Sequence, residues 1–118
     1  MVKALIIDDE IDICYLLSSI LKNKNVYPEY VNSLSAATIA LEQNSPSIIF
    51  LDNHLPDGMG MDFIRHIKKN APATKIVMLT AYDNTADRNK ALQLGADGFI
   101  GKPFTRDIIY QAVEQFFN

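Results

Sequence analysis

The chain has a single cysteine, Cys14, so no disulfide can form within it. This excludes a disulfide-stabilised secreted scaffold and fits a reducing cytoplasm, where we expect the protein to reside. Its longest apolar runs are four or five residues, whereas a helix needs roughly 20 apolar residues to cross a membrane. Met1-Val2-Lys3 leads directly into a strand-like run, so we expect no signal peptide.

The sequence also lacks a basic excess, an internal repeat and a low-complexity segment. Its formal net charge is −3, so we expect no clustered basic face and no direct binding of nucleic acid. Hydrophobic residues make up 48% and charged residues 21% of the chain, which is ordinary for a globular protein with a packed core. The 118 residues fit one domain, and we assign residues 1–118 to it.

Short apolar runs alternate with segments of helical periodicity along the whole chain. After the apolar run 4–7, apolar residues recur within 13–21 at the i, i+3, i+4 spacing of an amphipathic helix. Residues 53–60 are expected to form a loop. By the same reasoning, strands are predicted at 4–7, 26–31, 48–51, 76–79 and 98–100, and helices at 13–21, 35–43, 63–69, 84–94 and 108–117.

This alternation predicts an α/β fold of the (βα)5 type, with a doubly wound parallel sheet. The runs are apolar on both faces, which is typical of parallel strands covered by helices. Pro28 cannot donate a ladder hydrogen bond, so we place the second strand at an edge of the sheet. Sheets of this class bind ligands in the crevice beyond the carboxyl ends of their strands.

Polar residues follow the predicted strands at that edge: Asp8 and Asp9, Asp52, Thr80 and Lys102. Clustered carboxylates repel one another by roughly 1–4 kcal/mol per pair at 4 Å, and a divalent cation relieves this repulsion. Oxygen ligands of this kind suit Mg²⁺. A carboxylate can form an aspartyl phosphate, and Mg²⁺ with an ammonium group would offset the charge on a transferring phosphoryl group.

The sequence resembles the receiver (response-regulator) domain family of two-component signal transduction systems. The resemblance covers essentially the whole chain, and its motifs occur in the family's order and spacing. It implies a flavodoxin-like sheet with strand order 2-1-3-4-5. The matching segments are Ile7-Asp8-Asp9-Glu10, Leu51-Asp52, residues 55–60, Leu79-Thr80-Ala81 and residues 95–104.

The resemblance implies a role for each residue of the cluster. Asp52 would be the phospho-acceptor, and Asp9 and Asp52 would bind Mg²⁺ directly with the backbone carbonyl of His54. Asp8 would act through metal-bound water, and Lys102 would contact the phosphoryl oxygens. His54 stands where an apolar residue is common in the family, but its carbonyl would still be available as a ligand.

The resemblance also implies a switch. Thr80 would supply the switch hydroxyl and Phe99 the switch aromatic, although static packing is the alternative role for Phe99. Pro103 is expected to follow a cis peptide bond. Tyr82 and His54 are expected beside the crevice, where they could shield or position an attacking water.

We therefore expect a phosphorylation-dependent signalling switch rather than a turnover enzyme, with slow self-dephosphorylation. The phosphoryl donor would be a phosphohistidine of a histidine kinase or of a phosphotransfer protein. The surface formed by the fourth helix, fifth strand and fifth helix, about residues 84–117, would act on a downstream effector or an attached output domain. A phosphorylation-dependent homodimer is a further expectation, and no membrane partner is expected.

Three other functions remain as alternatives at this point. A flavin-binding electron carrier would need a glycine- and hydroxyl-rich phosphate loop where Asp8-Asp9-Glu10 stands. A phosphohydrolase with an aspartyl nucleophile would usually carry that nucleophile on the first strand. A degenerate receiver that serves only as a binding module would not need the intact set of acidic residues, Thr80 and Lys102.

Overall fold

The strands of the main sheet all run parallel, in the order β2-β1-β3-β6-β7. Because β6 and β7 are the fourth and fifth of the predicted strands, this is the expected order 2-1-3-4-5. The computed structural model describes residues 2–117. Within them the sheet strands are β1 (Val2–Ile7), β2 (Val26–Val31), β3 (Ile48–Asp52), β6 (Lys75–Thr80) and β7 (Gly98–Gly101). The helices are α1 (Ile11–Lys22), α2 (Leu34–Gln43), α3 (Gly60–Asn70), α4 (Thr85–Leu94) and α5 (Arg106–Phe117).

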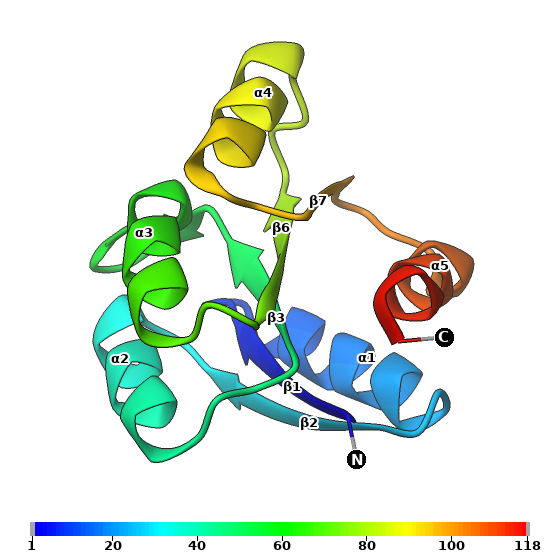
Figure 1. Ribbon diagram of the computed structural model, residues 1–118. Helices are drawn as coiled ribbons and strands as arrows, with labels where there is room; N and C mark the ends of the chain where they lie inside the picture. The colour runs from blue at the N-terminus through cyan, green and yellow to red at the C-terminus, as the bar shows by residue number, and fades with distance from the viewer. Residues whose placement is uncertain (1, 118) are drawn as a thin grey trace.

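Helices cover both faces of this sheet (Figure 1). Alternate residues of each strand point to opposite faces, so one strand contributes to two cores. Ile7 and Leu51 pack with α2, α3 and α4, whereas Ile6 and Phe50 pack with α1 and α5. All residues of β3 are buried, which explains why this strand reads as a continuous apolar run.

The ends of the helices follow from local hydrogen bonding. Ser33 caps α2 by accepting a hydrogen bond from the Ala36 N–H, and Asn84 caps α4 by accepting one from Asp87. Gly95 ends α4 with a left-handed φ of 116°, a conformation that glycine adopts without a steric penalty. None of the helices described is long and apolar enough to cross a bilayer.

The prediction of a plain loop at residues 53–60 was wrong. This segment contains a short antiparallel hairpin of β4 (His54–Leu55) and β5 (Gly58–Met59), in which His54 faces Met59. Helix α3 begins directly after it at Gly60 rather than near Phe63. Strands of two residues have no apolar alternation to reveal them, and the helix starts with a glycine that sequence patterns read as a breaker.

Candidate functional site

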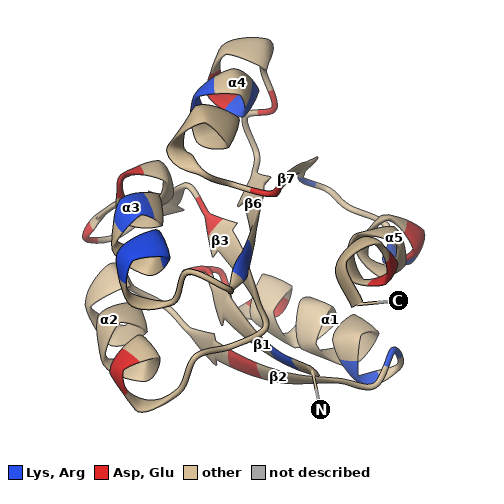
Figure 2. Cartoon of the chain, viewed as in Figure 1, with Lys and Arg blue, Asp and Glu red and all other residues tan. Residues whose placement is uncertain are grey.

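Parallel strands bring the predicted site residues to one edge of the sheet. Asp8 follows β1, Asp52 ends β3 and Thr80 ends β6, with exposed fractions of 0%, 4% and 2%. Lys102 follows β7, and its backbone N–H donates to the Thr80 carbonyl at 2.7 Å. Figure 2 shows the acidic end of β3 and the basic position just after β7 near this edge. Residues about 90 positions apart in sequence therefore meet, as predicted.

Lys102 bridges the two buried carboxylates. Its ammonium Nζ lies 2.8 Å from Asp8 Oδ2, 3.5 Å from Asp52 Oδ1 and 3.8 Å from Glu10 Oε1. Burial alone would lower the pKa of Lys102, but the carboxylates of Asp8, Asp52 and Glu10 outweigh burial and raise it. Lys102 is therefore a fixed cation at neutral pH rather than a solvated surface lysine.

The surroundings of Asp52 raise the pKa of its carboxyl group. Burial, and then the charge of Asp8, raise the pKa of Asp52 from 3.8 to about 6, against the opposing effects of Lys102 and the His54 backbone N–H. Ionised Asp52 is thus available at neutral pH but incompletely compensated. Binding of a cation, or conversion of the carboxylate to an acyl phosphate, would relieve the unfavourable energy of this buried charge.

The loop after β1 supplies the densest group of acidic oxygens. Carboxylate oxygens of Asp8, Asp9 and Glu10 lie within 4.8 Å of one another, and the Glu10 N–H donates to Asp8 Oδ1 at 2.9 Å. Buried Asp8 Oδ2 is paired with the Lys102 ammonium at 2.8 Å and has no further hydrogen-bond donor among the residues described. This all-oxygen donor set fits a hydrated hard cation such as Mg²⁺. Glu10 was not singled out from the sequence, although it stands in the same acidic motif.

The rings of His54 and Tyr82 pack edge-on against each other, two residues after Asp52 and two residues after Thr80 respectively. Their ring centroids are 5.0 Å apart at an interplanar angle of 63°, and Tyr82 is 62% exposed. The Thr80 hydroxyl oxygen accepts a hydrogen bond from the Tyr82 N–H at 3.0 Å. The hydroxyl proton of Thr80 is therefore available to donate to a new acceptor.

Phe99 is half-buried on β7, and the side chain of Arg88 stacks on its ring. This contact was not predicted from the sequence. The guanidinium carbon of Arg88 is 4.8 Å from the centroid of the Phe99 ring, and Arg88 Nη1 donates to the Phe99 carbonyl at 3.3 Å. Asp83 holds the same guanidinium at 2.9 and 3.1 Å. The Lys102–Pro103 peptide bond is cis, as predicted.

Cys14 lies behind the site and is fully buried. Its Sγ donates to the Asp8 carbonyl at 3.4 Å and accepts from Asn32 at 3.7 Å. Burial, and then the charge of Asp8, raise the pKa of the Cys14 thiol to about 11. Cys14 is thus a protonated packing residue.

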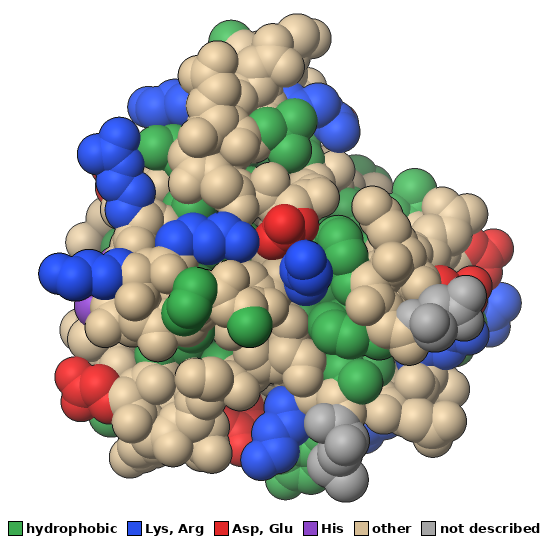
Figure 3. All heavy atoms as spheres, in the orientation of Figure 1, with side chains coloured by type: hydrophobic (Ala, Val, Ile, Leu, Met, Phe, Trp, Pro, Cys, Tyr) green, Lys and Arg blue, Asp and Glu red, His purple; other side chains and the backbone are tan. Residues whose placement is uncertain are grey.

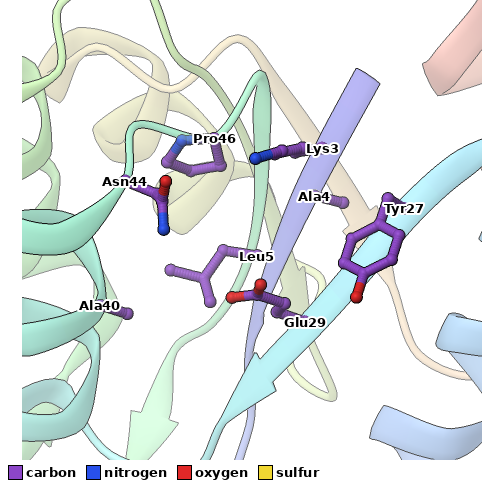
Figure 4. Close-up of a pocket in the computed structure, with 8 residues that line it drawn as sticks. All are labelled: Lys3, Ala4, Leu5, Tyr27, Glu29, Ala40, Asn44 and Pro46. Atoms are coloured by element: carbon purple, nitrogen blue, oxygen red, sulfur yellow. The ribbon is translucent and has the colours of Figure 1, made fainter. Parts of the chain in front are cut away.

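Two further surface features are a small pocket and the basic side chains over α3 and α4. A pocket near the amino end of β1 has a volume of about 20 Å³, room for roughly one water molecule. Its lining residues are Lys3, Ala4, Leu5, Tyr27, Glu29, Ala40, Asn44 and Pro46 (Figure 4). On the face in Figure 3, basic side chains over α3 and α4 are separated by uncharged and hydrophobic atoms and form no continuous basic surface there.

Comparison with known proteins agrees with this geometry. A model of the response regulator receiver domain matches residues 4–114. The chain therefore belongs to the response regulator receiver domain family of two-component systems, a family of regulatory phospho-acceptor domains. Membership argues against the flavin carrier and the phosphohydrolase, which belong to other families.

Similar response regulators occur in several bacteria. The chain is 34% identical over 105 residues to the phosphate regulon transcriptional regulatory protein PhoB of Escherichia coli, covering 87% of this chain and 46% of PhoB. It is 35% identical over 101 residues to the response regulator PilR of Pseudomonas aeruginosa, covering 86% of this chain and 23% of PilR. The chain thus spans less than half the length of these relatives.

Solved receiver structures superpose closely on the chain. The beryllofluoride-activated NtrC4 receiver domain dimer has a TM-score of 0.94 at 31% identity, covering 99% of this chain and 97% of that one. A two-component response regulator from Clostridium difficile has a TM-score of 0.94 at 28% identity, covering 98% and 95% of the two chains.

Proposed function

We propose that the chain is a phosphorylation-dependent switch that accepts a phosphoryl group on Asp52 in the presence of Mg²⁺. The observation that carries this proposal is the placement of Asp52. It is a buried, incompletely compensated carboxylate at a strand end, 3.5 Å from the Lys102 ammonium and beside the acidic loop after β1. A nucleophile, a cation for the phosphoryl oxygens and metal-binding oxygens thus meet in one crevice.

In the proposed transfer, an oxygen of ionised Asp52 attacks the phosphorus atom of a phosphohistidine. A P–O bond forms, the P–N bond breaks, and the imidazole leaves and takes up a proton. Lys102, now 3.5 Å from Asp52 and 2.8 Å from Asp8, would move toward the transferred oxygens and compensate their charge. Thr80 would donate its hydroxyl proton to one of these oxygens.

The metal would be held by this chain's own oxygens. Asp9, Asp52 and the His54 carbonyl would bind Mg²⁺ directly, and Asp8, whose carboxylate lies within 4.8 Å of that of Asp9, would act through a metal-bound water. Bound Mg²⁺ would supply charge compensation for the incoming phosphoryl group.

The remaining elements of the proposal concern partners and location. A histidine kinase or a phosphotransfer protein would donate the phosphoryl group, and residues 1–118 would form one receiver domain in the cytoplasm. Phosphorylation would alter the surface of α4, β7 and α5, which would act on an effector or an attached output domain. The dimer of the related NtrC4 receiver domain supports a phosphorylation-dependent homodimer.

The proposal is tested by incubating the protein with acetyl phosphate or a phosphorylated kinase, with Mg²⁺ or with EDTA, and measuring the intact mass. We expect one phosphate adduct that requires Mg²⁺ and is absent in Asp52→Asn. Asp62→Asn, which neutralises an exposed carboxylate on α3, is the matched control and should label normally. Undiminished labelling of Asp52→Asn would refute the assignment.

A further inference from the structure

Asn53, between the proposed acceptor and His54, accepts hydrogen bonds from the start of helix α3 through two oxygens. Its side chain is buried, at 3% exposure. Asn53 Oδ1 accepts a hydrogen bond from the Met61 N–H at 3.0 Å, and the Asn53 backbone carbonyl accepts one from the Gly60 N–H at 2.8 Å. One residue therefore engages the first two amides of α3.

Among the residues that the structure describes, no other side chain caps helix α3. Met59 occupies the N-cap position and makes no side-chain hydrogen bond. Early amides of a helix have no partner within the helix and need an external acceptor when they are buried. Met61 is buried, so Asn53 provides the acceptor that its amide would otherwise lack.

The same contacts hold the acceptor segment against the helix. A Cβ added at Gly60 would collide with the backbone carbonyl of Asp52, so α3 can approach the segment only because residue 60 is glycine. The peptide between Asn53 and His54 is held to α3 through its carbonyl. This carbonyl accepts from the Gly60 N–H at 2.8 Å.

We propose that Asn53 is a positioning residue for the metal site, acting through the Asp52 carboxylate and the His54 carbonyl. This inference rests on the proposed function, in which both groups bind Mg²⁺. Because the Asn53 side chain fixes the conformation of residues 52–54 relative to α3, its loss would leave the ligands present but less well oriented. Loss of groups that orient metal ligands typically lowers metal affinity about 10–100-fold.

The test compares Asn53→Leu, which keeps the approximate size of the side chain but removes the acceptor, with the wild-type protein. We expect the Kd for Mg²⁺, measured by calorimetry on folded protein, to rise about tenfold or more. Asn84→Leu is the matched control, because Asn84 Oδ1 makes the equivalent cap contact on α4, accepting from the Asp87 N–H at 2.8 Å. It should lower the melting temperature without changing the Kd for Mg²⁺.

A Kd in Asn53→Leu within twofold of wild type, or an equal rise in Asn84→Leu, would overturn the inference. In either case, Mg²⁺-dependent labelling of wild-type Asp52 would leave the proposed function intact, whereas a wild-type protein without Mg²⁺ binding would remove both. Hydrogen exchange of the metal-free wild type gives a second test that needs no variant. The Met61 amide should be protected, and rapid exchange would refute the contact on which the inference depends.

Discussion

Neutralising the proposed acceptor should stabilise the metal-free protein. In Asp52→Asn the buried carboxylate is replaced by an amide of nearly the same shape, so packing is preserved and charge is removed. The pKa of Asp52 is raised from 3.8 to about 6 by burial and by Asp8. A difference of about two units corresponds to roughly 3 kcal/mol between the protonated and ionised states. Structural relaxation should reduce the observable gain to about 1–2 kcal/mol.

The sign of the pH dependence follows from linkage. Because the pKa of Asp52 is higher in the folded than in the unfolded state, the folded protein binds more protons between about pH 4 and pH 6. The contribution of Asp52 to stability therefore falls as pH rises through this window, and its full penalty is present above pH 6. Asp52→Asn lacks this penalty, so its advantage should be largest at pH 7 and should shrink toward pH 4.

The assay is thermal unfolding in EDTA at a series of pH values between 4 and 8. A gain of 1 kcal/mol raises the melting temperature of a domain of this size by roughly 3–6 °C. Asp62→Asn, at an exposed position, serves as the control and should show no comparable gain. An Asp52→Asn protein that is no more stable than wild type at pH 7, or a gain independent of pH, would refute the reasoning.

Three further predictions concern the metal, His54 and the cation of the site. Mg²⁺ should raise the melting temperature of wild type, with about 2.7 kcal/mol of stabilisation at a hundredfold excess over Kd, and should do so much less in Asp52→Asn; an unchanged wild-type midpoint would count against the metal site. His54→Ala should still label but should lose its phosphoryl group faster in a mass-spectrometric time course, because the ring beside Tyr82 is gone; an unchanged decay rate would mean that only the His54 carbonyl matters. Lys102→Ala should lower the free energy of unfolding in urea without metal by about 3 kcal/mol, because Asp8 and Asp52 lose their buried cation, and should weaken the response to phosphorylation. Unchanged stability would show that this ion pair contributes nothing.

The fold could be predicted from the sequence because its strands are buried on both faces. The apolar runs ending in Asp8, Asp52 and Thr80 located three strands, and Pro28 placed β2 at the edge where the structure has it. Parallel alignment then brought the polar residues after these strands together. The apolar runs and the rule that parallel strands end at the same edge of a sheet were therefore sufficient to predict that Asp8, Asp52 and Thr80 lie together.

Other features depend on contacts that leave no local pattern. The stacking of Arg88 on Phe99 joins α4 to β7, and a helix that is polar around most of its surface gives no reason to select one arginine. The contact of Asn53 with α3 depends on a hairpin too short to be recognised from alternation. These are tertiary contacts of single side chains, whose partners are set by the three-dimensional path of the chain.

The energetics of the proposed switch require more than the Thr80 contact. Moving a two-state equilibrium from 1:99 to 99:1 takes about 5.5 kcal/mol, whereas one hydrogen bond to a charged group contributes roughly 1.5–3 kcal/mol. Inward movement of Phe99 would also have to give up its stacking with Arg88, worth about 0.5–1 kcal/mol at an exposed site. Thr80 alone therefore cannot complete the shift. The deficit must come from Lys102 exchanging Asp8 and Asp52 for the phosphoryl oxygens and from a partner that binds the altered surface, so phosphorylation without a partner should shift the population only in part.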